Sequence, residues 1–273
     1  MQIFFLLVLF LLGACFGSFL CCQARRIHLK SSNKKIKNKR SVCLSCNYQL
    51  KWYDNLPIIS WLFLKGKCRK CGKKIGLGEF LSELGLAIAF LLLGLGYGFS
   101  GLTFDTIPTH LAEWIIFIAV LVLVAGLGFL AIYDGLYGEL PVPILIFCVI
   151  CAIIIVTLRE WANFSNFENL GTNLLNLFFA VLILGGLYLT LFLISKGKWV
   201  GDGDWILGTI LALALGTPWL ALITLFLSNL IACLVMAPIV KKHQDKKIFF
   251  GPFMVIAFII VFSFSSFFNS LLS

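Results

Sequence analysis

Charged residues are scarce in this chain of 273 residues, where they make up 12%, about half the share of a soluble globular domain. Acidic residues are the scarcest, with 12 Asp and Glu against 22 Lys and Arg and a formal net charge of +10. So few charges cannot cover a soluble surface, and an apolar content of 60% excludes a disordered chain and a secreted disulfide scaffold. The apolar runs also lack the alternation of a transmembrane β-barrel. The composition therefore predicts a helical membrane protein with several spans.

Eight apolar segments are candidates for membrane-spanning helices, each of which needs about 20 residues to cross the bilayer. They are Ile3–Cys22, Phe80–Gly98, Ala112–Ile132, Val142–Leu158, Leu174–Ser195, Asp204–Gly216, Trp219–Pro238 and Phe249–Leu272. The sixth segment is short, with 13 residues. Thr217-Pro218 separates it from the seventh, because proline ends or kinks a helix.

The distribution of positive charge predicts the orientation of these spans. Of the 22 cations, 15 lie between Arg25 and Lys74, and basic residues collect in cytoplasmic loops. With that loop inside, eight spans place 21 of the 22 cations on the cytoplasmic side and only Arg159 outside. Merging the sixth and seventh segments would move the four lysines after Pro238 to the outside. We therefore predict eight spans with both termini outside.

The block between the first two spans is the only sizeable polar part of the chain, and it contains two Cys-x-x-Cys pairs. They are Cys43 with Cys46 and Cys68 with Cys71, and 21 residues separate them. Tetrahedral zinc bound by four thiolates takes this paired spacing, and Gly72 suits a tight turn beside the metal. The charge bias places the block in the reducing cytoplasm, which argues against disulfides. We predict a structural zinc site in an insert with few aliphatic side chains.

The run Lys30–Arg40 holds six cations in eleven residues. A basic loop beside a membrane is attracted to anionic lipid, and this is the interpretation we favour. Nucleic-acid binding is the alternative, but the run has no aromatic side chain that could stack on bases. We therefore expect membrane lipid, and no nucleic acid, as a partner of this loop.

Two aspartates lie at span ends on one side of the membrane. Asp134 ends the third span, and Asp204 opens the sixth in the run Gly201-Asp202-Gly203-Asp204. The predicted topology puts both at the cytoplasmic membrane face, so they can meet although 70 residues separate them. Gly201 and Gly203 allow close approach of the backbone.

Two facing carboxylates can hydrolyse a peptide without a metal, because the ionised one takes a proton from water and the protonated one polarises the scissile carbonyl. At about 4 Å and an effective dielectric near 20 their repulsion is about 4 kcal/mol, so the pair holds one proton over a wide pH range. The residues alone leave other roles open. Asp204 could be a helix N-cap, Asp134 an interfacial anchor, and the pair an ion or proton path in a transporter or channel. A zinc-bearing membrane scaffold is a further alternative.

A series of motifs makes the sequence resemble the bacterial type IV prepilin peptidases, membrane aspartyl proteases of the GxGD kind. They are Gly17-Ser18-Phe19-Leu20, Arg40-Ser41-Val42-Cys43-Leu44-Ser45-Cys46, Trp52, Asn55-Leu56-Pro57-Ile58-Ile59-Ser60-Trp61, Gly66-Lys67-Cys68-Arg69-Lys70-Cys71-Gly72, Glu83, Asp134 with Leu140-Pro141, Gly201-Asp202-Gly203-Asp204 and Phe250-Gly251-Pro252-Phe253. Each motif is weak alone, but their order and spacing are specific, and the resemblance covers nearly the whole chain.

The resemblance implies an enzyme that cuts the short basic leader from type IV prepilins or type II secretion pseudopilins at the cytoplasmic face of the bacterial inner membrane. Many such enzymes then methylate the new N-terminus with S-adenosylmethionine. By resemblance, Asp134 and Asp204 are the catalytic pair. The zinc site associated with the methylating form carries over to Cys43, Cys46, Cys68 and Cys71.

Three positions depart from the family pattern without removing a candidate aspartate. Leu44 replaces a proline, Val142 replaces an aspartate that often follows the Leu-Pro pair, and Ile206 replaces a frequent lysine. These departures bear on substrate preference and efficiency. Asp202 fills the variable position of its motif, and we assign it no chemistry.

The sequence thus predicts an all-α polytopic membrane protein of about eight transmembrane helices, with a small cytoplasmic zinc-binding insert between the first and second. Residues 1–22 are expected to form the first transmembrane helix, residues 23–79 the zinc domain, and residues 80–273 the membrane protease core.

Overall fold

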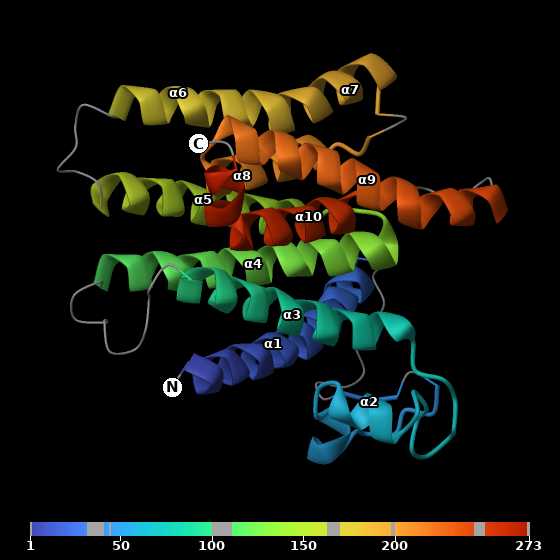
Figure 1. Ribbon diagram of the computed structural model, residues 1–273. Coiled ribbons are helices and arrows are strands. Elements are labelled where there is room, and N and C mark those ends of the chain that lie inside the picture. The colour runs from blue at the N-terminus through green and yellow to red at the C-terminus, as the bar shows by residue number, and fades with distance from the viewer. Residues whose placement is uncertain are drawn as a thin grey trace. The chain divides into compact units, whose positions relative to one another are not determined.

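A computed structural model of the protein describes residues 2–31, 41–43, 45–99, 111–162, 170–197, 200–242 and 249–271. Within these ranges the chain is helical apart from turns, bends and two isolated β-bridges (Figure 1). The helices are α1 (Gln2–Ser31), η1 (Trp52–Asn55), α2 (Ile59–Phe63), α3 (Leu77–Phe99), α4 (Leu111–Tyr137), α5 (Val142–Ala162), α6 (Leu170–Val181), η4 (Leu182–Gly186), α7 (Leu187–Ser195), α8 (Asp204–Leu215), α9 (Pro218–Lys242), α10 (Gly251–Ser263) and α11 (Ser265–Ser270). The all-α prediction is confirmed. Most of the basic run Lys30–Arg40 lies outside the described residues.

Among the residues that the structure describes, six helices are long and apolar enough to cross a membrane. They are Gln2–Lys30, Leu77–Tyr97, Leu111–Tyr137, Val142–Ala162, Leu170–Ser195 and Pro218–Ala237. Two further apolar helices, α8 and α10, have 12 and 13 residues. The structure therefore has a helix at each of the eight predicted segments, although the sixth and the last are shorter than a full span. The polytopic membrane class is confirmed.

The chain forms two compact units, which we call the N-terminal unit (Ile3–Leu91) and the C-terminal unit (Leu92–Ser273, with Met1–Gln2). The N-terminal unit contains α1, the cysteine-bearing insert and most of α3. The C-terminal unit contains the end of α3 and all later helices. The expected division into three parts at residues 22 and 79 stays a prediction.

Helices α1 and α3 cross closely in the N-terminal unit at two glycines of α1. A Cβ atom on Gly13 would lie 2.4 Å from the carbonyl oxygen of Leu86, and one on Gly17 would lie 2.4 Å from that of Ser82. Glycines four residues apart let two membrane helices bring their backbones together. The crossing therefore depends on the absence of side chains at both positions.

The short helix α8 is the centre of the C-terminal unit. It contacts α5, α6, η4, α7, α9 and α10. Its apolar side chains, such as Leu207 and Leu211, are fully buried, because this helix is surrounded by protein rather than lipid. Twelve residues span about 18 Å, well short of the hydrocarbon thickness. Gly216, with φ of 77°, ends α8, and Pro218 begins α9, as the predicted break at Thr217-Pro218 requires.

The fifth predicted span is a helix in which the π-helical stretch η4 separates α6 from α7. Two glycines bring this stretch against α8. A Cβ atom on Gly185 would lie 2.4 Å from Thr209 Oγ1, and one on Gly208 would lie 2.9 Å from the Leu184 carbonyl oxygen. The segment therefore packs backbone to backbone beside the helix that begins with Asp204.

Candidate functional site

Asp134 lies near the C-terminal end of α4, and its side chain is buried, with 6% exposed. Its Oδ2 atom accepts a hydrogen bond of 3.0 Å from the backbone N–H of Gly251, the first residue of α10. A Cβ atom at that glycine would lie only 2.7 Å from the same oxygen. The motif Phe250–Phe253, at the start of the last predicted span, therefore positions the first aspartate, a role that the sequence alone did not reveal.

Asp204 is the first residue of α8 and is equally buried, with 7% exposed. Its Oδ2 atom accepts a hydrogen bond of 3.0 Å from the backbone N–H of Gly201. A Cβ atom on Gly203 would lie 2.7 Å from Leu140 Cδ1, in the segment that follows α4. One glycine of the motif thus holds the carboxylate, while the other lets the two motif-bearing segments approach.

The two carboxylates lie close enough to interact electrostatically. Both belong to the C-terminal unit, where α10 contacts α4 as well as α8. Tyr188 of α7 also interacts electrostatically with Asp204, and its ring centroid lies 5.5 Å from that of Phe250. Sequence analysis did not single out Tyr188, because one tyrosine in an apolar span forms no recognisable pattern.

The four predicted metal ligands converge in the N-terminal unit. Their Sγ atoms all lie within 4.8 Å of one another. The distance is 3.9 Å between the sulfurs of Cys43 and Cys71 and 4.0 Å between those of Cys46 and Cys68. Four sulfurs arranged tetrahedrally about 2.3 Å from one zinc ion are about 3.8 Å apart. The cluster therefore has the dimensions of a tetrathiolate site and can hold a metal ion.

The two Cys-x-x-Cys turns have the same backbone geometry. The N–H of Asn47 donates to the carbonyl oxygen of Cys43, and the N–H of Gly72 donates to that of Cys68, both at 2.9 Å. Both donor residues are in the left-handed region, with φ of 54° and 67°. An isolated antiparallel bridge closes each turn. Glycine and asparagine tolerate this conformation best, so the predicted role of Gly72 is shared by Asn47 in the first turn.

The thiols of the cluster differ in acidity. The backbone N–H groups of Cys71 and Lys70 lower the pKa of Cys68 to about 6, so it is ionised at neutral pH. The backbone N–H of Tyr48 lowers the pKa of Cys46, but desolvation and the neighbouring sulfurs outweigh this and raise it to about 11. A bound cation would displace the remaining protons, so metal affinity should rise with pH.

Asp54 lies in the basic insert but is buried, with 8% exposed. Its Oδ1 atom accepts a hydrogen bond of 2.8 Å from Arg69 Nε, and its Oδ2 atom accepts one of 3.2 Å from the Lys51 backbone. The guanidinium also lies over the Tyr53 ring, at 5.0 Å. This ion pair connects η1 to the second cysteine turn and helps to hold the insert together.

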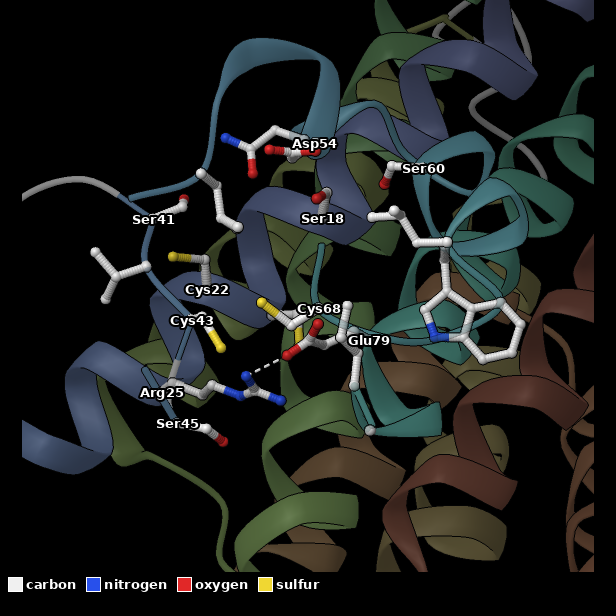
Figure 2. Close-up of a pocket in the computed structure, with 18 of the residues that line it drawn as sticks. Ser18, Cys22, Arg25, Ser41, Cys43, Ser45, Asp54, Ser60, Cys68 and Glu79 are labelled. Atoms are coloured by element: carbon white, nitrogen blue, oxygen red, sulfur yellow. Dashed lines mark hydrogen bonds and ion pairs between the residues drawn. The ribbon is translucent and has the colours of Figure 1, made fainter. Parts of the chain in front are cut away.

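A pocket of about 650 Å³ lies beside the cysteine cluster in the N-terminal unit (Figure 2). Cys43 and Cys68 belong to its wall, together with residues from α1 and α3. Figure 2 shows Arg25 of α1 extended to Glu79 of α3, with which it forms an ion pair. The metal cluster and the pocket therefore share residues.

The pocket lining carries both signs of charge and hydrogen-bonding groups. Glu83 of α3 accepts a hydrogen bond of 2.7 Å from the Ile58 backbone N–H, which ties the insert to the helix. Trp61 stacks on Phe80 at a centroid distance of 4.5 Å, and its Nε1 atom is buried with no partner in the described part of the chain. Such a lining suits a ligand that has both positive and negative groups.

Comparison with known proteins places these features in context. Residues 11–97 match the family model described as the bacterial peptidase A24 N-terminal domain. A prepilin leader peptidase/N-methyltransferase of Myxococcus xanthus is 38% identical over 104 residues, which cover 38% of this chain and 29% of that protein. The proteins of the same name from Aeromonas hydrophila and Vibrio cholerae are 28% and 39% identical, over 80% and 32% of this chain and 69% and 34% of their own lengths. No solved structure gives a significant match.

These findings confirm the resemblance to the bacterial type IV prepilin peptidases. The stretch that the family model matches, residues 11–97, contains the cysteine cluster and the pocket, while the match to the Aeromonas hydrophila protein covers 80% of the chain. The relatives are named as peptidases, which supports the prediction that this chain is an enzyme of that class. The roles of Asp134 and Asp204 and of the four cysteines stay predictions.

Proposed function

We propose that this chain is a prepilin peptidase whose catalytic pair is Asp134 and Asp204. The observation that carries the proposal is that both carboxylates are buried, each is held by a glycine N–H, and the two interact electrostatically. Both glycines belong to motifs of the family that the chain resembles. An N-cap or an interfacial anchor needs neither the burial nor the second carboxylate.

The proposed reaction is hydrolysis of one peptide bond by a carboxylate pair that shares a proton. The ionised carboxylate takes a proton from water, and the resulting hydroxide attacks the scissile carbonyl. The protonated carboxylate donates a hydrogen bond to the carbonyl oxygen as negative charge develops there. The carboxylate that took the proton from water then gives it to the leaving nitrogen as the C–N bond breaks, which releases the leader and frees the new N-terminal amine. The backbone N–H groups of Gly201 and Gly251 keep one oxygen of each carboxylate in place. No metal takes part in this step.

A transporter with an acidic pair at its inner mouth remains the alternative for the same two residues. Two features favour the peptidase. The glycine spacing around Asp204 is that of the GxGD motif, and the chain has a tetracysteine insert. Transport requires neither.

We propose zinc as the ion of the cysteine cluster, because four thiolates at tetrahedral spacing suit it. Its role would be structural, since four protein ligands leave no open coordination position for a substrate. Between Ser41 and Ile75, Cys68 is the only buried hydrophobic residue among those that the structure describes, and the helices η1 and α2 have four and five residues. The metal would therefore supply much of the stability of the insert.

We further propose that the enzyme methylates the N-terminus that it exposes, with S-adenosylmethionine as donor. The names of the relatives and the charged pocket beside the cysteine cluster support this. When bound, the donor supplies an electrophilic methyl group. Within the pocket, Glu79 and Glu83 can bind its hydroxyl and ammonium groups, Arg25 its carboxylate, and Trp61 Nε1 a further acceptor.

The proposed substrates are type IV prepilins or type II secretion pseudopilins, in which a short basic leader precedes an apolar segment. Cleavage would take place at the cytoplasmic face of the bacterial inner membrane. The charge bias of the predicted loops supports this placement. The division into a first helix, a zinc domain and a membrane protease core is part of the same proposal.

A prepilin cleavage assay with purified full-length protein tests the proposed catalytic pair. We expect Asp134→Asn and Asp204→Asn each to abolish cleavage, because asparagine keeps the size of the side chain but cannot transfer the proton. The exposed neighbour Asp202 provides the matched control, since Asp202→Asn removes one carboxylate from the same loop. Near-normal cleavage by either variant of the pair would remove that residue from the mechanism, provided that the protein inserts normally.

A further inference from the structure

A second cavity, of about 310 Å³, lies in the C-terminal unit. It is formed where α5 and α10 end, between the end of α8 and the start of α9. Asp204 and Gly251 lie at the opposite ends of α8 and α10, and Asp134 accepts a hydrogen bond from Gly251. The cavity is therefore remote from the aspartates and belongs to neither of the proposed activities.

The chemistry of the lining is that of an anion site. The polar groups that the argument uses are Arg159, Thr217, Ser263, Ser265, Ser266 and Asn269. Arg159 carries the only formal charge among the described residues that line the cavity, and no carboxylate is present there. One cation surrounded by hydroxyl and amide donors favours a ligand with negative charge.

The guanidinium of Arg159 is oriented but not neutralised. Its Nη1 atom donates a hydrogen bond of 2.6 Å to the carbonyl oxygen of Ala214, and its centre lies 5.5 Å from the ring centroid of Phe262. It also interacts with the Tyr97 phenol. None of these groups is a carboxylate, and within the described ranges no ion pair involves Arg159. Five N–H donors on a planar guanidinium leave some for a bound anion.

Two hydroxyl groups at the cavity support a ligand independently of the arginine. Thr217 Oγ1 and Ser263 Oγ are buried and have no hydrogen-bond partner in the described part of the chain, and Ser263 as a whole is 5% exposed. Buried polar groups without hydrogen-bond partners are rare in native proteins, so these two hydroxyls indicate a bound ligand that supplies the partner. Thr217 directly precedes α9, whose first-turn N–H groups have no acceptor within the helix.

We propose that this cavity binds the phosphate of an anionic phospholipid headgroup. Exposed apolar side chains next to the lining residues would contact the acyl chains, because Trp219, Phe267 and Leu271 are 56%, 58% and 66% exposed. Inorganic phosphate has no apolar part that could contact these side chains. A zwitterionic headgroup would bring a cation that finds no carboxylate in the cavity.

Native mass spectrometry of the full-length protein in detergent tests this assignment, with dioleoylphosphatidylglycerol and dioleoylphosphatidylcholine as probes. We expect the wild-type protein to prefer the anionic lipid by about tenfold, which corresponds to about 1.4 kcal/mol. Arg159→Gln should remove that preference. Lys196→Gln, which removes an exposed cation beyond the end of α7, is the matched control and should leave the preference unchanged.

A second variant keeps the test decisive if Arg159→Gln fails to fold, since that arginine also caps α8. Thr217→Val with Ser263→Ala removes the two unpartnered hydroxyls and leaves the arginine in place, and it should weaken binding of the anionic lipid severalfold. Equal binding of both lipids by the wild type would overturn the proposal. So would unchanged binding in the double variant, or full displacement of the lipid by millimolar inorganic phosphate, which would identify a free-anion site. Loss of peptidase activity would not bear on any of these outcomes.

Discussion

A methyl group added to Gly251 would lie 2.7 Å from Asp134 Oδ2, closer than a carbon atom approaches a carboxylate oxygen. We therefore expect Gly251→Ala to displace the carboxylate and to lower prepilin cleavage about 100-fold, because misplacing a reacting group by about 1 Å can have such an effect. Gly135→Ala is the control, since a Cβ atom there meets nothing closer than Pro252 Cγ at 3.8 Å. The cleavage rates of the two purified variants distinguish displacement of the Asp134 carboxylate from the effect of adding a methyl group anywhere near it. Equal rates would show that the Gly251 backbone does not set the position of Asp134.

The two cysteine turns allow a test of backbone conformation without a steric contribution. Gly72 has φ of 67°, and a Cβ atom on it would meet nothing within 4 Å. Gly72→Val should weaken zinc retention about tenfold, because the left-handed region costs a residue with a Cβ atom about 1–2 kcal/mol. Asn47→Gly, which relieves the same conformation in the first turn, should retain zinc at least as well as the wild type. Competition with a chromogenic chelator measures both, and equal affinities of the two variants would contradict the argument.

Among the secondary-structure elements, the long spans were the most predictable, because about 20 consecutive apolar residues have few alternatives. The predicted segment Val142–Leu158 begins where α5 begins. The sequence could not show that α1 continues to Ser31, since polar residues outside the membrane give no apolar signal. It also missed the break that splits the last predicted span near Phe264.

The candidate site was predictable only in part. The aspartates and cysteines have motif spacing and were identified from it. Their backbone hydrogen-bond donors were not predicted, because the N–H group of a glycine acts through its position in the fold and every residue except proline has one. Asn47 and Tyr188 were missed for a similar reason: each acts through the fold that surrounds it.

The crossing of α1 and α3 supports a prediction at the level of helix packing. Gly17→Leu would place a large side chain where the Ser82 carbonyl oxygen lies 2.4 Å from an added Cβ atom. We expect it to destabilise the protein by about 1–3 kcal/mol, as overpacking of a tight interface does. Gly85→Leu on α3 is the control, because a Cβ atom there meets nothing within 4 Å. Thermal unfolding in detergent compares the two, and equal midpoints would argue against a close helix crossing.

For the whole molecule, the chief feature is that the two proposed chemistries fall in different compact units. The N-terminal unit Ile3–Leu91 carries the four cysteines and the charged pocket, while the C-terminal unit carries Asp134 and Asp204. The second unit has its own buried core around α8, with fully buried side chains such as Leu211 and Phe258. Loss of the metal should therefore affect the two units unequally.

This separation leads to a prediction for Cys68→Ser. The substitution removes a thiol whose pKa is lowered to about 6, so zinc binding should fail and the insert should lose its structure. Because residues of the insert line the pocket proposed for the methyl donor, N-methylation should be lost completely. Leader cleavage should be lost only in part, since the carboxylate pair needs no metal and the C-terminal unit keeps its core.

Mass spectrometry of the mature pilin separates the two activities, because methylation adds one CH₂ to the N-terminus. Cys233→Ser, which removes an exposed thiol from α9, should leave both activities intact. A Cys68→Ser enzyme that still methylates would show that the insert does not form the transferase site. One that inserts normally but no longer cuts would show that the peptidase depends on the insert as well.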